Sequence, residues 1–341
     1  MKYEPPKNFL RIGTIDMHTG GEPLRILLEG LPEIKGHTIL EKRRYFRDHL
    51  DHIRTGCMFE PRGHADMYGA VITKPERPDS AFGTFFMHNE GYSTMCGHAT
   101  LALTKFAVET GMVKPENGVA KMKIDAPPGQ LTAEARVDHD GIVRKSSFWN
   151  VPSFVLYRDQ TVDVPGIGKV SFDVAYGGAF YAFVEAQPLG LQLTADEYGP
   201  LIDAGRKIKK AVMENFAIRH PYEEDLSFLY GTIFTGEAKK PEHHSRNVCI
   251  FADGEVDRSA TGSGVSARAA LHYAKGEMKP GDRFIIESIL DTTMEVEIAE
   301  VTTFGPHQAV IPKVSGSAWF TGKSEFWFDP EDPLKKGFIF R

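Results

Sequence analysis

Two short segments combine reactive side chains with glycines in a way that suits proton transfer on a small carboxylate ligand. Residues 96–98 read Cys-Gly-His, and residues 261–264 read Thr-Gly-Ser-Gly. Each segment stands just before a stretch typical of a helix. A helix N-terminus offers unpaired N–H groups and partial positive charge, which hold a carboxylate and favour a thiolate. The spacing therefore predicts a reactive thiol at Cys96. The glycines in both segments would let backbone N–H groups approach a ligand closely.

Residue type alone leaves simpler interpretations open for both positions. A single cysteine is usually a small buried hydrophobe, and a threonine before a helix is usually an N-cap. Cys96 and Thr261 are singled out because they occupy equivalent places in an internal repeat. Cys57 and Cys249 lack that context and are expected to be structural, and the pair His243-His244 is expected in a solvated loop.

The repeat is an internal duplication in one constant register. Residues 96–115 read CGHATLALTKFAVETGMVKP, and residues 261–280 read TGSGVSARAALHYAKGEMKP. A second echo lies upstream of each copy, where HTGGEPLRILLEG (18–30) resembles AYGGAFYAFVEA (175–186). We interpret the chain as two related halves.

Each half is expected to position its reactive segment on a central helix. Residues 98–110 are apolar nearly all round, which predicts a buried helix. Gly111 and Gly276 stand where a glycine ends a helix. Alternating segments predict strands around these helices, namely RILLEG, KMKIDA, QLTAEARV, RFIIES and TMEVEIAEV. Facing helix starts would clamp a small carboxylate between the halves.

These residues resemble the proline racemase family. The segments MCGHAT (95–100) and VDRSATGSG (256–264) resemble its two active-site motifs. Three further blocks match in the same order: DMHTGGEP (16–23), PRGHADMYGA (61–70) and RNVCIFADGEVDRS (246–259). The resemblance extends from about residue 10 to residue 323.

The resemblance implies a diaminopimelate-epimerase-like α+β fold, with two pseudo-symmetric halves and the active site between them. We expect residues 1–150, joined by the C-terminal segment 316–341, to form the half that carries Cys96. Residues 151–315 are expected to form the half that carries Thr261. The family also suggests a homodimer.

By the same resemblance, the substrate has defined neighbours. Cys96 is expected to remove the α-proton, and Thr261 stands where the epimerases of the family carry a second cysteine. The expected substrate-binding groups are His98 and Asp257 at the ring nitrogen, the backbone N–H groups of Gly97, His98, Gly262 and Ser263 at the carboxylate, and Tyr68 and Phe251 against the ring.

The threonine is the informative departure from the family pattern. The second motif usually reads Pro-Cys, whereas this chain has Ala260-Thr261. A threonine hydroxyl is a poor acid or base at neutral pH, so two-sided proton exchange is not expected. The Cys/Thr pair resembles the trans-3-hydroxy-L-proline dehydratases of the family. In their substrate the α-hydrogen and the hydroxyl share one ring face, so one base on one face can suffice for loss of water.

The expected reaction is a cofactor-independent syn elimination that yields Δ1-pyrroline-2-carboxylate. Cys96, His98 or a water would protonate the leaving hydroxyl, and the role of Thr261 stays open. The nearest alternative is a 4-hydroxyproline 2-epimerase or proline racemase. An alternative of another class is a non-catalytic amino-acid binding protein. A cysteine hydrolase using Cys96 and His98 ranks last, because residues two apart at a helix start seldom give thiolate–imidazolium geometry.

Composition limits the other function classes. The chain has 341 residues, a net charge of -6 and 25% charged residues. This charge gives no electrostatic support for nucleic-acid or anionic-membrane partners, and no apolar run is long enough for a membrane span. Three cysteines argue for a reducing compartment, and with no signal-like N-terminus we expect the cytoplasm. No metal, nucleotide or redox cofactor is expected, since Gly-rich phosphate-binding patterns are missing.

Overall fold

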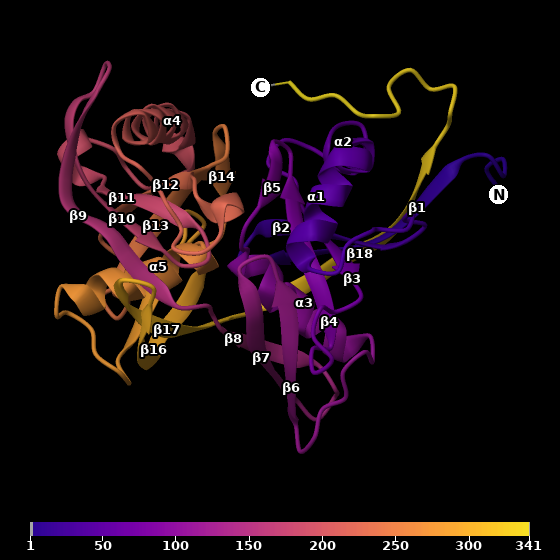
Figure 1. The fold of residues 1–341 in the computed structure, drawn as a ribbon, viewed down its shortest axis with the longest axis horizontal. Helices are drawn as coiled ribbons and strands as arrows, with labels where there is room; N and C mark the ends of the chain where they lie inside the picture. Colours follow the sequence, from indigo (N-terminus) through magenta and orange to yellow (C-terminus); the bar gives the residue numbers. More distant parts are fainter. Residues whose placement is uncertain (1–2, 341) are drawn as a thin grey trace.

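The computed structural model describes residues 3–340, whose helices and strands form two groups side by side (Figure 1). The first group, called here the first half, consists of β1 (Leu10–Thr19), β2 (Glu22–Glu29), α1 (Ile39–His49), α2 (Asp51–Met58), β3 (Tyr68–Thr73), β4 (Phe82–His88), β5 (Gly91–Ser93), α3 (Gly97–Glu109), β6 (Val119–Ala126), β7 (Gly129–Val137), β8 (Val143–Trp149) and β18 (Ala318–Phe328). The second half consists of β9 (Ser153–Val164), β10 (Gly168–Tyr176), β11 (Phe180–Glu185), α4 (Tyr198–Asn215), β12 (Leu229–Gly236), β13 (Ser245–Phe251), β14 (Glu255–Asp257), α5 (Gly262–Ala274), β15 (Arg283–Glu287), β16 (Thr293–Phe304) and β17 (His307–Gly316).

The strand pairing is the same in both halves. In the first half β2 pairs in parallel with β3, β4 pairs antiparallel with β3 and β5, and β4 is parallel to β6. In the second half β11 pairs in parallel with β12, β13 pairs antiparallel with β12 and β14, and β13 is parallel to β15. Both series continue antiparallel, as β6–β7–β8 and as β15–β16–β17. The repeated topology confirms the expected pseudo-symmetric α+β fold.

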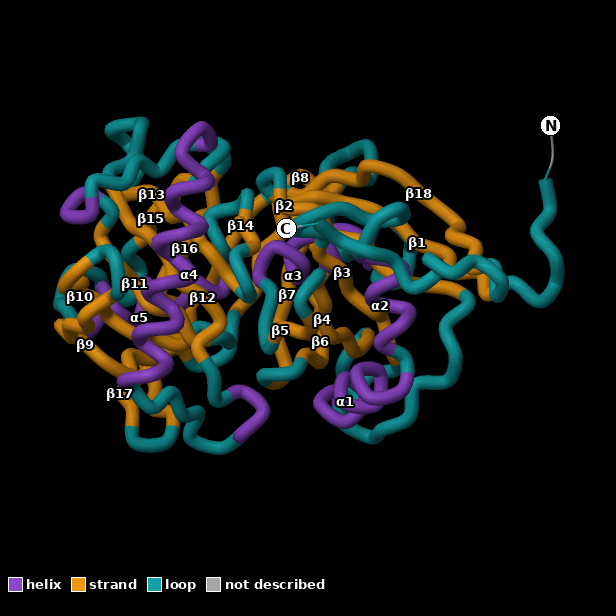
Figure 2. Tube along the Cα trace, turned by 90° about the horizontal axis from the view of Figure 1, so that it is seen from above, coloured by secondary structure: helices purple, strands orange, loops and turns teal. Residues whose placement is uncertain are grey.

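A buried helix lies at the centre of each half. Strands surround α3 in one half and α5 in the other (Figure 2). Side chains of α3 are buried from Gly97 to Val108, and those of α5 from Gly262 to Leu271. Gly111 and Gly276 follow the helices with φ of 78° and 74°, a conformation that glycine adopts without strain. The two central helices and their glycine stops are confirmed.

The halves are joined through the sheet as well as through the chain. Strand β17 pairs with β8 in the register Lys313↔Trp149 and also with β9. The chain then crosses back to the first half, where β18 pairs along the whole of β1 (Figure 1). Within residues 3–340, no helix combines the length and the apolar character that a membrane span requires.

Candidate active site

The N-termini of α3 and α5 touch at two glycines. A Cβ built on Gly97 would lie 2.4 Å from Cα of Gly262, and a Cβ built on Gly262 would lie 2.6 Å from Cα of Gly97. Any side chain at either position would push the helices apart. The contact places the unpaired N–H groups of both helix starts around one point, which is the arrangement that a carboxylate requires.

Cys96 is the N-cap of α3 and belongs to the first half. Its Sγ accepts a hydrogen bond from the backbone N–H of Ala99 at 3.3 Å, and it lies 3.2 Å from Nδ1 of His98. His98 Nε2 lies 3.3 Å from the carbonyl oxygen of Pro23. A carbonyl only accepts, so Nε2 carries the hydrogen and Nδ1 is left as an acceptor beside the thiol.

Burial decides the protonation of this pair. Burial raises the pKa of the Cys96 thiol well above its usual value, although the Ala99 N–H acts in the opposite direction. The expected lowering by the helix start is therefore outweighed in this closed conformation. Burial also lowers the pKa of His98 to about 3, so the imidazole is neutral at pH 7. A thiolate–imidazolium pair of the cysteine-hydrolase kind does not form here.

Thr261 occupies the N-cap position of α5 but does not cap the helix. Its side chain makes no cap hydrogen bond, and its backbone has φ of 66°, which is costly for a β-branched residue. Its buried hydroxyl has no well-formed hydrogen bond among the described residues. Burial raises the pKa of both Asp257 and Cys249, and the nearby Thr261 hydroxyl acts against this effect in each case. The capping interpretation of Thr261 therefore fails.

Asp257 is the last residue of β14 and lies in the wall of the same site. Its Oδ1 accepts a hydrogen bond from the backbone N–H of Ser259 at 2.8 Å. Burial raises the pKa of Asp257 to about 6, against the effect of the hydrogen bond from Ser259 and of the nearby Thr261 hydroxyl. The carboxylate is thus the ionised form at neutral pH and can face a substrate ammonium.

The remaining predicted residues complete the wall. Ser263 shares a hydrogen bond of 2.7 Å with the Tyr181 hydroxyl. The ring of Tyr68 meets the ring of His98 edge-on, with centroids 4.8 Å apart, and the ring of Phe251 at 6.1 Å. All nine predicted residues line one small cavity of about 20 Å³, namely Tyr68, Cys96, Gly97, His98, Phe251, Asp257, Thr261, Gly262 and Ser263. Their chemical roles remain predictions.

The same cavity has further lining residues that the sequence analysis did not select, namely Glu22, Met95, Tyr181, Tyr230 and Cys249. One of them had a usable signal. Cys249 and Phe251 are two apart on β13, and residues two apart on a strand share a face. Expecting Phe251 in the site therefore implied Cys249 as a lining residue too, and the expectation that Cys249 is structural stays a prediction.

Access to the cavity requires the halves to separate. Cys96, His98 and Thr261 are each at most 4% exposed. Contacts between the halves close the site from several sides: the Arg258 N–H donates to Glu22 Oε2 at 2.7 Å, Arg258 pairs with Asp66 at 2.8 Å, and His88 lies 3.1 Å from Glu255. A ligand reaches Cys96 only when these contacts open.

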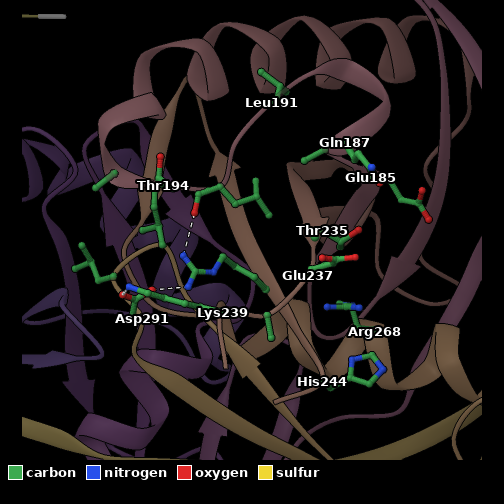
Figure 3. Close-up of a pocket in the computed structure, with 18 residues that line it drawn as sticks. Glu185, Gln187, Leu191, Thr194, Thr235, Glu237, Lys239, His244, Arg268 and Asp291 are labelled. Carbon is green, nitrogen blue, oxygen red and sulfur yellow. Dashed lines mark hydrogen bonds and ion pairs between the residues drawn. The ribbon is translucent and has the colours of Figure 1, made fainter. Parts of the chain in front are cut away.

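A larger cavity lies in the second half and is not where the predicted chemistry gathers. It has a volume of about 1150 Å³ and is lined by polar groups that include Glu185, Glu237, His244 and Arg268 (Figure 3). Among the described residues that line it, none is one of the nine predicted site residues. The small buried cavity, which holds the Cys96 thiol and the Asp257 carboxylate beside the facing helix starts, is the candidate active site.

Comparisons with known proteins agree with this geometry. The family model described as proline racemase matches residues 14–339. A relative from Colwellia psychrerythraea named trans-3-hydroxy-L-proline dehydratase is 52% identical, over 98% of this chain and 94% of its own. A relative of the same name from Homo sapiens is 48% identical, over 97% of this chain and 95% of its own. A solved hydroxyproline epimerase from Agrobacterium vitis, with bound trans-4-hydroxy-L-proline, superposes with a TM-score of 0.91 at 26% identity, covering 97% of this chain and 96% of its own.

Proposed function

This chain belongs to the proline racemase family, and from that premise we propose that it dehydrates trans-3-hydroxy-L-proline to Δ1-pyrroline-2-carboxylate. The observation that carries the proposal is the unequal pair at the two facing helix starts. Cys96 caps α3, whereas the equivalent place before α5 holds Thr261. One strong base therefore serves one face of the substrate. Relatives at about half identity that bear the dehydratase name support the same reaction.

The substrate's zwitterion fits the charges of the site. Asp257 supplies a carboxylate for the ring ammonium, and neutral His98 offers Nδ1 as a hydrogen-bond acceptor. The N–H groups of Gly97, His98, Gly262 and Ser263 are proposed to bind the substrate carboxylate. The same groups stabilise the negative charge that develops on this carboxylate when the α-proton leaves. Tyr68 and Phe251 enclose the ring.

The Cys96 thiolate is the proposed base. Burial disfavours the thiolate in the closed site, but a bound ammonium brings a positive charge close to it, and nearby opposite charge favours the ionised form. The thiolate removes the α-proton and the electron pair forms the Cα–C3 double bond. The hydroxyl takes a proton from an acid of the site and departs from the same face as water. The enamine then tautomerises to Δ1-pyrroline-2-carboxylate.

Three finer points belong to the same proposal. The reaction requires only proton transfers, so we propose that it runs without a cofactor. A homodimer is proposed on the family resemblance, and light scattering of the purified protein tests it. The cytoplasm is the proposed location, supported by the sparse cysteines, which are free in the structure.

Mass spectrometry of reaction mixtures tests the proposal. Purified protein is incubated separately with trans-3-hydroxy-L-proline, trans-4-hydroxy-L-proline and L-proline, beside a Cys96→Ser variant. We expect the 3-hydroxy compound alone to lose one water, with a rate that falls by roughly 10²–10⁴-fold in the variant. Release of water at the wild-type rate without the Cys96 thiol would contradict the mechanism. Binding of the planar analogue pyrrole-2-carboxylate with no turnover of any compound would favour a binding protein.

A further inference from the structure

Glu22 contributes a buried carboxyl group to the cavity that contains Cys96. Its residue is 0% exposed, and it lines the site together with Asp257 and Thr261. Glu22 is the first residue of β2 and follows a turn at Gly20 and Gly21. No role for Glu22 was expected from the sequence.

The turn before Glu22 is fixed to the same helix start that carries Cys96. The Thr19 hydroxyl donates to the carbonyl oxygen of His98 at 2.9 Å. His98 Nε2 in turn donates to the carbonyl oxygen of Pro23 at 3.3 Å. Glu22 lies between these two attachments in the chain. Its carboxyl group therefore keeps its place relative to Cys96, on the first-half side of the cavity.

Glu22 and Asp257 are held in different protonation states. Burial raises the pKa of Glu22 well above its usual value, and the nearby Asp257 carboxylate and Asp66 raise it further, against Arg258. Two neighbouring carboxyl groups whose surroundings separate their pKa values can divide the roles of acid and anion. Asp257 is the anion of the pair, and Glu22 retains its proton.

The hydrogen bonds of Glu22 indicate which oxygen carries that proton. Oε2 accepts a hydrogen bond from the backbone N–H of Arg258 at 2.7 Å. Oε1 is buried and has no hydrogen-bond partner among the described residues. A neutral carboxyl group has one O–H donor, and the accepting oxygen is Oε2, so the proton belongs on Oε1. A buried O–H group without an acceptor costs free energy. A ligand oxygen in the cavity would accept the hydrogen bond from Oε1 and remove this cost.

We propose that Glu22 is the general acid that protonates the C3 hydroxyl as it leaves. This role rests on the dehydration proposed above. As Cys96 takes the α-proton and the C3–O bond breaks, the proton on Glu22 Oε1 passes to the departing oxygen and forms water. Cys96 is then a thiol and Glu22 a carboxylate. Transfer of the thiol proton to Glu22, directly or through the released water, restores both groups.

The stereochemistry of the substrate supports this assignment. The α-hydrogen and the hydroxyl of trans-3-hydroxy-L-proline lie on one ring face, so base and acid must act from one side. Cys96 and Glu22 both belong to the first half, where the chain on either side of Glu22 is bonded to His98, whereas Thr261 belongs to the second half. A base and an acid from one half meet the requirement of a syn elimination.

A substrate whose leaving group needs no proton tests whether Glu22 acts as an acid. The variant Glu22→Gln keeps the shape of the side chain but has no acidic proton. We expect its dehydration of trans-3-hydroxy-L-proline to fall by roughly 10²–10⁴-fold. Its elimination of chloride from trans-3-chloro-L-proline should stay within a few-fold of wild type, because chloride departs unprotonated. Cys96→Ser should lose both activities, and Glu29→Gln, at the exposed end of the same strand, should lose neither.

The possible results distinguish the role of Glu22 as an acid from the dehydration activity on which that role depends. Equal losses with both substrates in Glu22→Gln would assign Glu22 to closing the halves and overturn its role as an acid. Full retention of dehydration would also overturn that role. A wild-type protein that releases no water from trans-3-hydroxy-L-proline would remove the proposed function itself, and the role with it.

Discussion

Two carboxyl groups, Glu22 and Asp257, line the same cavity but are suited to different roles. Both are buried, and burial raises the pKa of each. Asp257 also accepts the Ser259 N–H, which favours its ionised form, whereas Glu22 lies beside the Asp257 charge, which favours its neutral form. One group is prepared to hold a cation and the other to give up a proton. His98 stays neutral in the same cavity.

The pH dependence of substrate capture follows from Asp257. Its pKa is raised to about 6, mainly by burial, so the carboxylate that holds the ring ammonium is lost as pH falls through that value. We expect kcat/KM to fall on the acid side with an apparent pKa near 6, by about tenfold per pH unit below it. Initial rates from pH 4.5 to 8 measure this. A wild-type profile in which kcat/KM does not fall at low pH would contradict this role of Asp257. The Asp257→Asn variant should have a reduced kcat/KM at every pH.

Thr261 is the residue that separates elimination from two-sided proton exchange. A cysteine at this place would put a second thiol opposite Cys96, on the other face of the α-carbon. We expect Thr261→Cys to acquire exchange of the α-proton of trans-4-hydroxy-L-proline with deuterated solvent, which the wild type lacks. Proton NMR detects the exchange, and Thr261→Ser serves as the control without a thiol. A Thr261→Cys protein that folds normally but shows neither exchange nor inversion would refute the two-face account.

At the scale of elements, the contact between α3 and α5 sets the width of the site. The Cβ of an alanine at position 97 would overlap Cα of Gly262, and overpacking of this kind typically costs about 1–3 kcal/mol. We expect Gly97→Ala to lower the melting temperature and to abolish turnover, because the N–H groups that bind the carboxylate move apart.

A glycine elsewhere in a helix gives the matched control. Gly199 lies in the first turn of α4, and nothing lies within 4 Å of a Cβ built there. Gly199→Ala should keep full activity and an equal or slightly higher melting temperature, because alanine restricts the unfolded chain. Thermal unfolding and initial rates of both variants make the comparison. Wild-type activity in Gly97→Ala would show that the close contact is not needed.

The central helices could be predicted from the sequence because their signals are local. An apolar stretch, a glycine stop and a repeated register all lie within about 20 residues of each reactive position. Glu22 could not be selected in this way. It is distant from Cys96 in sequence, and it reaches the site only through pairing of β1 with β2 and through the bonds of Thr19 and Pro23 to His98. The raised pKa of the Cys96 thiol could not be predicted either. The helix start, which favours a thiolate, is visible in the sequence, whereas the depth of burial, which disfavours the thiolate, is not.

At the scale of the whole molecule, the site exists only where the halves meet. Each half contributes one helix start, and the contacts of Arg258 with Glu22 and Asp66 join the two halves beside the cavity. The repeated strand order confirms the duplication inferred from the sequence. The boundaries at residues 150 and 316 stay predictions. A duplicated half alone could not enclose a ligand from both faces.

Opening of the halves should control the reactivity of the thiols. Cys96 is 4% exposed and lies between the halves, whereas Cys57 is 0% exposed on the buried face of α2. We expect iodoacetamide to alkylate Cys96 under native conditions before Cys57, and pyrrole-2-carboxylate to slow this reaction by holding the halves closed. Peptide mass spectrometry after timed quenching measures both. Equal labelling of Cys57 and Cys96 would indicate that access follows unfolding rather than opening.

Elimination of water from one face of the substrate can be followed in a single proton NMR time course in D2O. The wild-type protein is followed with trans-3-hydroxy-L-proline, beside trans-4-hydroxy-L-proline and L-proline. The account predicts that the 3-hydroxy compound is converted to Δ1-pyrroline-2-carboxylate while the other two keep their configuration and their α-protons. Inversion or α-deuteration of trans-4-hydroxy-L-proline or L-proline, without formation of Δ1-pyrroline-2-carboxylate from the 3-hydroxy compound, would contradict it and identify an epimerase.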